Sequence, residues 1–412
     1  MNQTNQIWKN PKIWTLAIAE TLVWSGQFYL FPALLLQWNQ SFEWSVSLIS
    51  GAFSISLLAS AFFSIFVGRI IDRGKGRILM TLSALIGGLI LIFLSQIQTI
   101  GLFYLSWLLL GLTTSGCLYP ACFSYLTNVY KDDAKRPIML VTLLGGFAGT
   151  ICYPITSYYV ELFDWQFAAI FWGLVNIFIC APLFRYSNLE KTFQIQKNVS
   201  KNEKLNRLEI LKFFKNPIFI LIAISFTLVA TNNGMVVSQI FPSLESRGFS
   251  IVLTVFFASL FGPAQVASRL LVFILDSFDR TKISVSILFP VALFIMGFAS
   301  ILFMIGKGNF VLIFLFVVIQ GGAWGLMSFM TPEVTWKFLG FKNFALILAL
   351  VSFGGKIGAA FAPLLAGFLG QYFGYNILML ATGLLVIIAG VSFITVLLIT
   401  NYSNRILGSK IA

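Results

Sequence analysis

A dense cluster of charges interrupts the otherwise apolar first 130 residues of the chain. Residues 68–77 read GRIIDRGKGR, and long apolar stretches flank this cluster on both sides. A helix of about 20 apolar residues crosses the hydrocarbon core of a bilayer, which is about 30 Å thick. The cluster therefore predicts a tight polar turn between two membrane-spanning helices, with Gly74 and Gly76 permitting the reversal of the chain.

The same reading extends over the whole chain. Of the 412 residues, 58% are apolar and only 10% are charged, and the mean hydropathy is +0.91. The predicted spans are 12–38, 46–68, 78–97, 101–130, 137–161, 165–185, 216–243, 250–275, 281–305, 309–335, 343–370 and 374–400. The expected fold class is an all-α membrane protein, with twelve transmembrane helices in two pseudo-symmetric six-helix bundles.

One long polar stretch divides the chain into two halves. Residues 186–215 are rich in Lys and Asn, and apolar residues at helical spacing within 205–211 predict a short amphipathic helix on the inner membrane surface. The expected organisation is an N-terminal bundle (1–185), a cytoplasmic linker (186–215) and a C-terminal bundle (216–412). Residues 276–282, DSFDRTK, follow span eight and resemble a weakened copy of the 68–77 cluster.

The basic residues predict the orientation in the membrane. Lys and Arg number 27, Asp and Glu number 14, and the formal net charge is +13. With both termini in the cytoplasm, the outer loops hold only Arg247 and Lys307 as basic residues, as the positive-inside rule requires. We therefore expect a multi-pass protein of a bacterial inner (plasma) membrane. The positive charge lies in short loops on one side, so it does not indicate nucleic-acid binding.

Several kinds of chemistry are not expected. The chain has no His, which excludes histidine relays. Its four cysteines lie in apolar segments without the spacing of metal ligands, and they predict buried free thiols. No G-x-x-x-x-G-K-[ST] sequence occurs, so a pump driven by ATP is not expected. We expect no enzymatic activity, no cofactor and no metal.

Tryptophans cluster at the ends of the predicted spans. The five are Trp8, Trp14, Trp38, Trp44 and Trp165. Such positions predict anchors in the membrane interface, with stacking on a substrate as the alternative.

The charged turn also carries a resemblance. Its pattern, G-R-x-x-D-R-x-x-G-R, resembles the loop between the second and third helices of the major facilitator superfamily. The matching residues are Gly68, Arg69, Asp72, Arg73, Gly76 and Arg77. The resemblance implies that Asp72 pairs with basic residues and caps a helix of the other half, so that the turn latches a cytoplasmic gate. The alternative is a topology signal alone, although such a signal needs neither the Asp nor the glycines.

Ionisable residues inside the spans are the first candidates for transport chemistry, because a charge in the bilayer core is costly. Lys356 and Arg269 are predicted to bind an anionic substrate, with a structural ion pair for Lys356 and the inner interface for Arg269 as alternatives. Glu20 and Glu333 are predicted to couple protons. Glu20 is equally consistent with a buried structural carboxyl, and Glu333 with a gate position.

Uncharged polar residues complete the predicted substrate site. In the superfamily, spans one, four, seven and ten line the central cavity, and most of these residues fall on them. Each is alternatively a hydrogen bond between helices. They are Gln27, Tyr29, Tyr119, Asn232, Asn233, Gln265 and Gln320.

Within the superfamily, several stretches resemble the monocarboxylate transporter branch and its bacterial relatives. They are residues 29–32 (YLFP), 43–50 (EWSVSLIS) and 145–149 (GGFAG). That branch carries D-x-x-x-R in span eight, where the Arg binds a carboxylate and the Asp takes a proton. This chain has Arg269, but Gln265 replaces the Asp, and Ala33 replaces the lysine that follows F-P in span one.

The predicted function is a secondary active transporter that moves a small, carboxylate-like organic anion by alternating access, coupled to protons. The alternatives are a proton-antiport exporter of a metabolite, siderophore or drug, and a non-transporting sensor or assembly factor on the same scaffold. The expected partners are the small-molecule substrate, protons and the lipid bilayer, and the expected state is a monomer.

Overall fold

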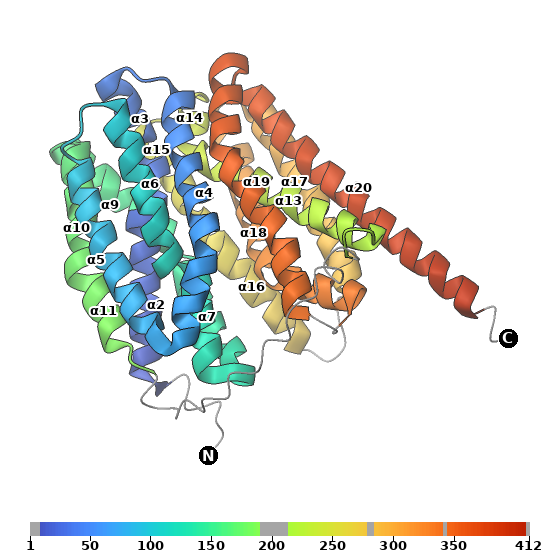
Figure 1. Ribbon diagram of the computed structural model, residues 1–412. Coiled ribbons are helices and arrows are strands. Elements are labelled where there is room, and N and C mark those ends of the chain that lie inside the picture. Colours follow the sequence, from blue (N-terminus) through green and yellow to red (C-terminus); the bar gives the residue numbers. More distant parts are fainter. Residues whose placement is uncertain (1–8, 190–212, 278–283, 341–343, 409–412) are drawn as a thin grey trace. The chain divides into compact units, whose positions relative to one another are not determined.

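The computed structural model describes residues 9–189, 213–277, 284–340 and 344–408, and the secondary structure in these ranges is helical (Figure 1). The predicted amphipathic helix at 205–211 and most of the 276–282 copy lie outside the described residues.

Helices occupy all twelve predicted spans. The bounds in the first six are α2 (Pro11–Trp24), η1 (Ser25–Tyr29), α3 (Leu30–Phe42), α4 (Val46–Ile70), η2 (Ile71–Lys75), α5 (Gly76–Leu94), α6 (Ile100–Cys117), α7 (Tyr119–Tyr130), η3 (Lys131–Ala134), α8 (Lys135–Gly145), α9 (Ala148–Leu162), α10 (Trp165–Val175), η4 (Asn176–Cys180) and α11 (Ala181–Tyr186).

In the last six spans, spans seven and eight are each divided into two helices, and each of the last four spans is a single long helix. Their bounds are α13 (Pro217–Ser238), α14 (Ile240–Glu245), α15 (Ile251–Ser259), α16 (Phe261–Ser277), α17 (Val285–Gly306), α18 (Phe310–Leu339), α19 (Phe344–Phe373) and α20 (Tyr375–Gly408). Polar side chains fix several helix starts by accepting a backbone N–H: Ser45 caps α4, Asp164 caps α10 and Asn309 caps α18.

Ten helical segments in the described part of the chain are long and apolar enough to cross a membrane. One of them, Val46–Leu94, contains two predicted spans on either side of the charged turn. The continuous helical run from Pro11 to Phe42 is not among the ten, and it matches the first predicted span. The expected all-α membrane fold with twelve spans is therefore confirmed.

Contacts divide the chain into two compact units. The first contains Met1–Lys197 together with Ser238–Pro263, and the second contains Asn198–Val237 and Ala264–Ala412. Segment 238–263 groups with the first unit through specific bonds. Gln239 Nε2 donates to Ser50 Oγ at 2.8 Å, and Thr150 Oγ1 donates to the Ser259 carbonyl at 2.7 Å.

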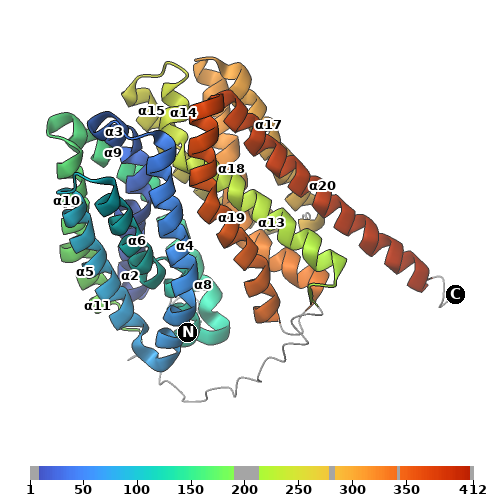
Figure 2. The same ribbon diagram turned by 45° about the horizontal axis from the view of Figure 1, so that its top comes forward.

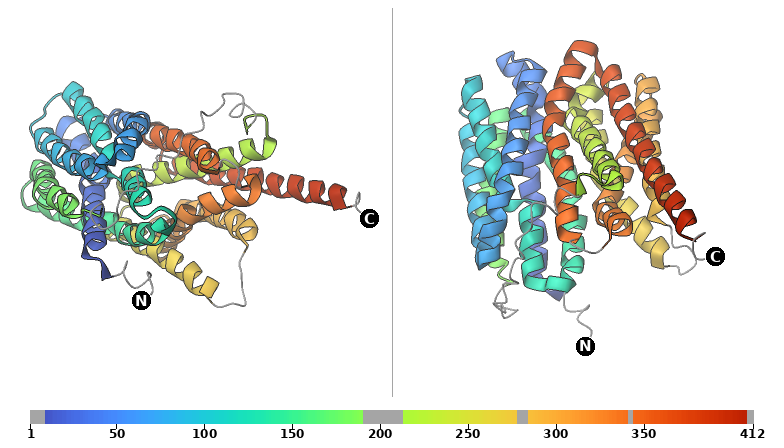
Figure 3. Two further views of the ribbon diagram at one scale, coloured as in Figure 1. Left: turned by 60° about the horizontal axis from the view of Figure 1, so that its bottom comes forward. Right: turned by 45° about the vertical axis from the view of Figure 1, so that its right-hand side comes forward.

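Each unit has its own packed interior. In the first, α4 and α5 pack against α6, and α5 also packs against α10 (Figure 2). In the second, α17 lies against both α18 and α20, and the pairing of α17 with α20 is visible from several sides (Figures 1 and 3). Large apolar side chains such as Phe178, Ile287 and Leu398 are more than 60% exposed, as expected of surfaces that face lipid.

Two of the tryptophans at span ends are not interfacial. Trp38 is fully buried and Trp165 is 3% exposed, and their rings lie 6.2 Å apart inside the first unit. Phe103 and Trp107 complete this aromatic cluster, both edge-on to Trp38. The prediction of interfacial anchors was wrong for these two, because their rings point into the bundle. The prediction of four buried free cysteines is confirmed.

Candidate functional site

The charged turn is a bent helix rather than an open loop. Helix α4 passes into the π-helical turn η2, and the chain reverses at Gly74, whose φ of 74° lies in the left-handed region that favours glycine. Gly76 has ordinary helical angles and begins α5. Its importance is steric, because an added Cβ would lie 2.9 Å from the Tyr125 ring. The expectation that both glycines supply conformational freedom was thus right only for Gly74.

The turn is tied to its own bundle at two places. Asn128 of α7 donates to the Asp72 carboxylate at 3.2 Å, and Arg77 Nη1 donates to the Arg185 carbonyl at the end of α11 at 3.3 Å. Arg69 lies 5.9 Å from the centre of the Phe66 ring. Residues of the motif therefore join the cytoplasmic ends predicted for spans two, four and six. Gly68 is helical and has open space around it.

Gln27 is held inside the first unit by other helices. It is fully buried, its Nε2 donates to Asn176 Oδ1 at 3.0 Å, and its Oε1 accepts from Thr113 Oγ1 at 3.0 Å. Asn176 in turn donates to the Trp172 carbonyl at 2.8 Å. Gln27 lies in η1 and Asn176 in η4, so a π-helical turn presents each amide. We call Gln27, Thr113 and Asn176 the N-clamp.

The second unit has a corresponding arrangement. Gln320 Nε2 donates to Asn232 Oδ1 at 2.6 Å, and Asn232 Nδ2 donates to the Thr382 carbonyl at 2.9 Å. Asn232 and Gln320 are fully buried. These residues, the C-clamp, join spans seven, ten and twelve, as the N-clamp joins spans one, four and six. Asn233 differs in being half-buried, and its Oδ1, like Gln320 Oε1, has no hydrogen-bond partner in the described part of the chain.

Glu20 is the one fully buried acidic residue of the described chain. The Trp24 indole and the Cys122 thiol approach its carboxyl, but neither carboxyl oxygen has a partner with hydrogen-bond geometry among the described residues. The thiols of Cys117 and Cys180, from α6 and η4, also lie within electrostatic range of the carboxyl. Ionising this carboxyl would place a negative charge in a dry interior, which is costly.

Half-buried aromatic rings from spans one and four form a continuous surface on the first unit. Trp24 lies 4.8 Å from Tyr119 and 5.0 Å from Phe28, and Phe28 lies 5.2 Å from Tyr29. Phe123 stacks on Tyr119 at 5.0 Å. Tyr29 and Tyr119 were both predicted for the substrate site, and the structure places them in this one aromatic surface.

Arg269 and Gln265 are brought together on α16. Arg269 Nη2 donates to Gln265 Oε1 at 3.4 Å, and Arg269 Nε donates to the Gly325 carbonyl of α18 at 2.9 Å. A Cβ on Gly325 would lie 2.6 Å from the Gln265 carbonyl oxygen, so glycine allows the close crossing of α16 and α18. The guanidinium is half-buried at this crossing.

Lys356 lies near the middle of the 30-residue helix α19, about 18 Å along its axis from the first residue. It is half-buried, and its ammonium makes no hydrogen bond or ion pair with any described residue. The glycines around it serve helix packing. A Cβ on Gly354 or Gly358 would collide with Thr227 or Thr231 of α13. They therefore permit the close approach of α13 to α19.

Two predicted residues remain, and both are exposed: Arg73 in η2 and Glu333 near the end of α18. No group of three or more His, Cys, Asp and Glu side chains in the described ranges has the geometry to hold a metal ion. Sequence reasoning missed Asn176, Thr113 and Thr382. Uncharged polar residues are common in membrane helices, and only the packing shows which of them meet.

This fold defines the class of protein: an all-helical, multi-pass membrane protein with polar groups buried in two helix bundles. Residues 16–337 match the family model of the Major Facilitator Superfamily, so the chain belongs to that family. It is therefore a transporter rather than an enzyme. No curated protein sequence matches the chain.

Solved structures share the fold at low sequence identity. A bacterial homologue of the human lysosomal transporter Spinster, in an inward-facing and occupied conformation, has a TM-score of 0.74 at 15% identity, covering 93% of this chain and 96% of that one. The nucleoside transporter NupG has a TM-score of 0.70 at 15% identity, with coverage of 94% and 99%. A mutant of the peptide transporter POT, in complex with alafosfalin, has a TM-score of 0.72 at 12% identity, with 93% of each chain covered.

Proposed function

We propose that this transporter carries a small, carboxylate-like organic anion across a bacterial inner membrane by alternating access, with proton coupling. The proposal rests on the surroundings of Lys356. Its ammonium is half-buried, lies deep in an apolar helix and has no anionic partner among the described residues. A buried cation without a partner is costly, and an anionic substrate would remove that cost while it is bound.

Arg269 supports the same substrate class. A guanidinium presents donors in a planar fork that suits a carboxylate, and the Gly325 and Gln265 oxygens hold this one in a fixed orientation. Asn233 of the second unit also fits a role in substrate binding, because its side-chain Oδ1 has no partner among the described residues.

Proton coupling is assigned to Glu20. Its carboxyl lies in a dry interior, so gaining or losing a proton there would change the stability of the first unit. Both termini would lie in the cytoplasm, as the distribution of basic residues predicts.

Reconstituted vesicles test this function. A thermal-shift screen of carboxylates selects the probe, and uptake of that radiolabelled carboxylate is then measured with an imposed proton gradient. Lys356→Gln and Arg269→Gln should each reduce uptake at least about tenfold, since a hydrogen bond to a charged group contributes about 1.5–3 kcal/mol. Lys215→Gln, which changes an exposed lysine just before α13, is the matched control.

Wild-type uptake by both variants would refute the anion site. Accumulation driven by an inward proton gradient supports symport. Extrusion driven by the same gradient would instead favour the proton-antiport exporter, and no transport of any screened compound would favour the sensor.

A further inference from the structure

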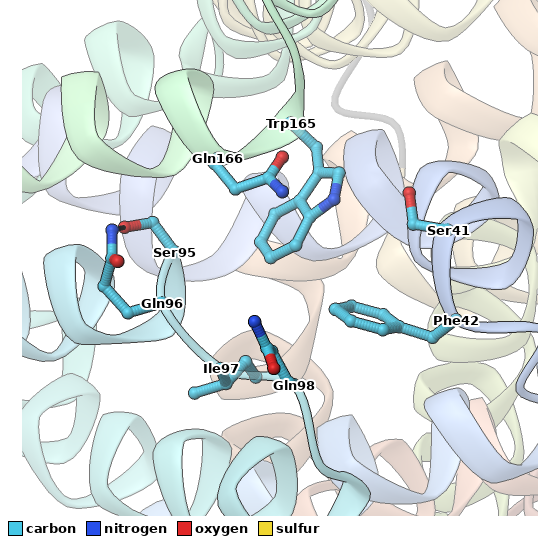
Figure 4. Close-up of a pocket in the computed structure, with 8 residues that line it drawn as sticks. All are labelled: Ser41, Phe42, Ser95, Gln96, Ile97, Gln98, Trp165 and Gln166. Atoms are coloured by element: carbon cyan, nitrogen blue, oxygen red, sulfur yellow. Dashed lines mark hydrogen bonds between the residues drawn. The ribbon is translucent and has the colours of Figure 1, made fainter.

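A cavity of about 540 Å³ lies in the first unit, where α3 ends, α5 passes into α6 and α10 begins (Figure 4). These helix ends are at the opposite end of α4 from the charged turn. The cavity is thus separate from Glu20, the N-clamp and the turn. Its volume falls within the range of about 300–1,000 Å³ that is usual for small-molecule sites.

The lining of the cavity is polar but uncharged. Gln98 and Gln166 lie on opposite sides of it, Ser41 and Ser95 add hydroxyl groups, and Phe42 and Trp165 supply an aromatic wall (Figure 4). No Asp, Glu, Lys or Arg side chain is part of the lining. A charged ligand would therefore find no counter-ion here, whereas a neutral ligand rich in hydrogen-bonding groups would find both donors and acceptors.

One side-chain atom of a lining residue is left without a partner. Gln166 Oε1 is buried and has no hydrogen-bond partner among the described residues. Most buried polar atoms in proteins are hydrogen-bonded, so an exception calls for an explanation. Gln166 is a lining residue, so rotation of its side chain would bring this oxygen within reach of a hydroxyl group bound in the cavity.

The walls of the cavity are held in place. The Asp164 carboxylate accepts from the Phe167 N–H at 2.9 Å and so fixes the start of the helix that bears Trp165 and Gln166. The Trp165 ring packs edge-on against Phe42 at 5.6 Å, and Phe42 stacks on Trp44 at 4.3 Å. Little side-chain entropy would thus be lost when a ligand binds.

We propose that this cavity is a second ligand site, separate from the transport pathway, for a neutral sugar. Sugar hydroxyls both donate and accept, as amide and serine side chains require, and the apolar face of a pyranose ring fits an aromatic wall. The sugar is either a free saccharide or the headgroup of a glycolipid, since both present the same chemistry.

The test measures binding and does not depend on transport. The protein is purified in a detergent without a sugar headgroup and placed in phosphatidylcholine nanodiscs. Maltose binding is followed by saturation-transfer NMR. A second preparation contains monoglucosyl diacylglycerol, whose retention is measured by native mass spectrometry.

Saturable binding of maltose or selective retention of the glycolipid supports the site, and which of the two occurs identifies the source of the sugar. Gln166→Leu should weaken that binding about tenfold, the loss expected for about one buried hydrogen bond. Gln98→Leu should also weaken it. Gln40→Leu, which changes an exposed glutamine of α3 outside the cavity, should leave binding unchanged.

Two results would overturn the proposal. One is the absence of both maltose binding and glycolipid retention by the wild-type protein. The other is binding that persists unchanged in both Gln166→Leu and Gln98→Leu.

Discussion

Two glycines of the charged turn, six residues apart, differ in what their backbone requires. Gly74 has a φ of 74°, where a side chain is strained, whereas Gly68 is helical and nothing lies within 4 Å of the position of a Cβ. The sequence motif contains Gly68 but not Gly74. Backbone geometry therefore identifies a requirement that the motif alone does not.

This difference predicts opposite effects on stability. Gly74→Ala should lower the free energy of unfolding by about 1 kcal/mol, because alanine is strained in the left-handed region. Gly68→Ala should raise it by up to about 1 kcal/mol, because alanine favours the helix more than glycine does. Thermal unfolding of the two variants in detergent measures both effects. Equal stability of the two variants would contradict the backbone argument.

Glu20 gives a second prediction at this scale. Glu20→Gln keeps the shape of the side chain but removes its ability to carry a charge. We expect uptake in reconstituted vesicles to lose its dependence on the proton gradient, while exchange of substrate without a gradient continues. Gradient-driven accumulation at the wild-type level would show that Glu20 is a structural carboxyl. Glu161→Gln, at an exposed position near the end of α9, is the control.

At the scale of helices, the two clamps show what sequence could and could not predict. Apolar length and the positions of charges located the spans, because both depend on chain order alone. Gln27, Asn232 and Gln320 were correctly placed inside the spans, but the sequence left open whether they face a substrate or another helix. That choice depends on helix rotation, and the π-helical turns η1 and η4 change the rotation by inserting residues into spans one and six.

The N-clamp predicts coupled effects of mutation. Gln27→Leu and Asn176→Leu should each destabilise the protein by about 1–3 kcal/mol, since each leaves buried polar groups without a partner. The double variant should lose less than the sum, with a coupling energy of about 1 kcal/mol. A double-mutant cycle on thermal unfolding measures this coupling. Additive losses would mean that the bond between the two amides contributes nothing to stability.

At the scale of the whole molecule, the family and the fold were predictable from one ten-residue motif and the count of spans. The interior cation Lys356 was predictable as well, because its charge stands out in an apolar helix. The cavity near Trp165 was not, since it is built from segments far apart in the sequence: 41–42, 95–98 and 165–166. None of these short segments carries a recognisable pattern.

The proposed latch role of Asp72 is tested by turnover. Asp72→Asn should lower the maximal transport rate several-fold and leave the half-saturating substrate concentration nearly unchanged, because Asp72 is not among the residues proposed to bind the substrate. Asn128→Leu removes the bond to Asp72 but keeps the charge, so it should have the smaller effect. An unchanged maximal rate in Asp72→Asn would remove the latch argument.

The anchoring of the charged turn has a practical consequence for spectroscopy. The turn is bonded to α7 and α11 of its own unit through Asp72 and Arg77, and Gly76 is packed against Tyr125. Lys75, within it, is exposed, and the four native thiols are all buried. A nitroxide spin label attached to the cysteine of Lys75→Cys would thus move together with its bundle. Distances measured from it would report motion of the whole bundle rather than local motion of the turn.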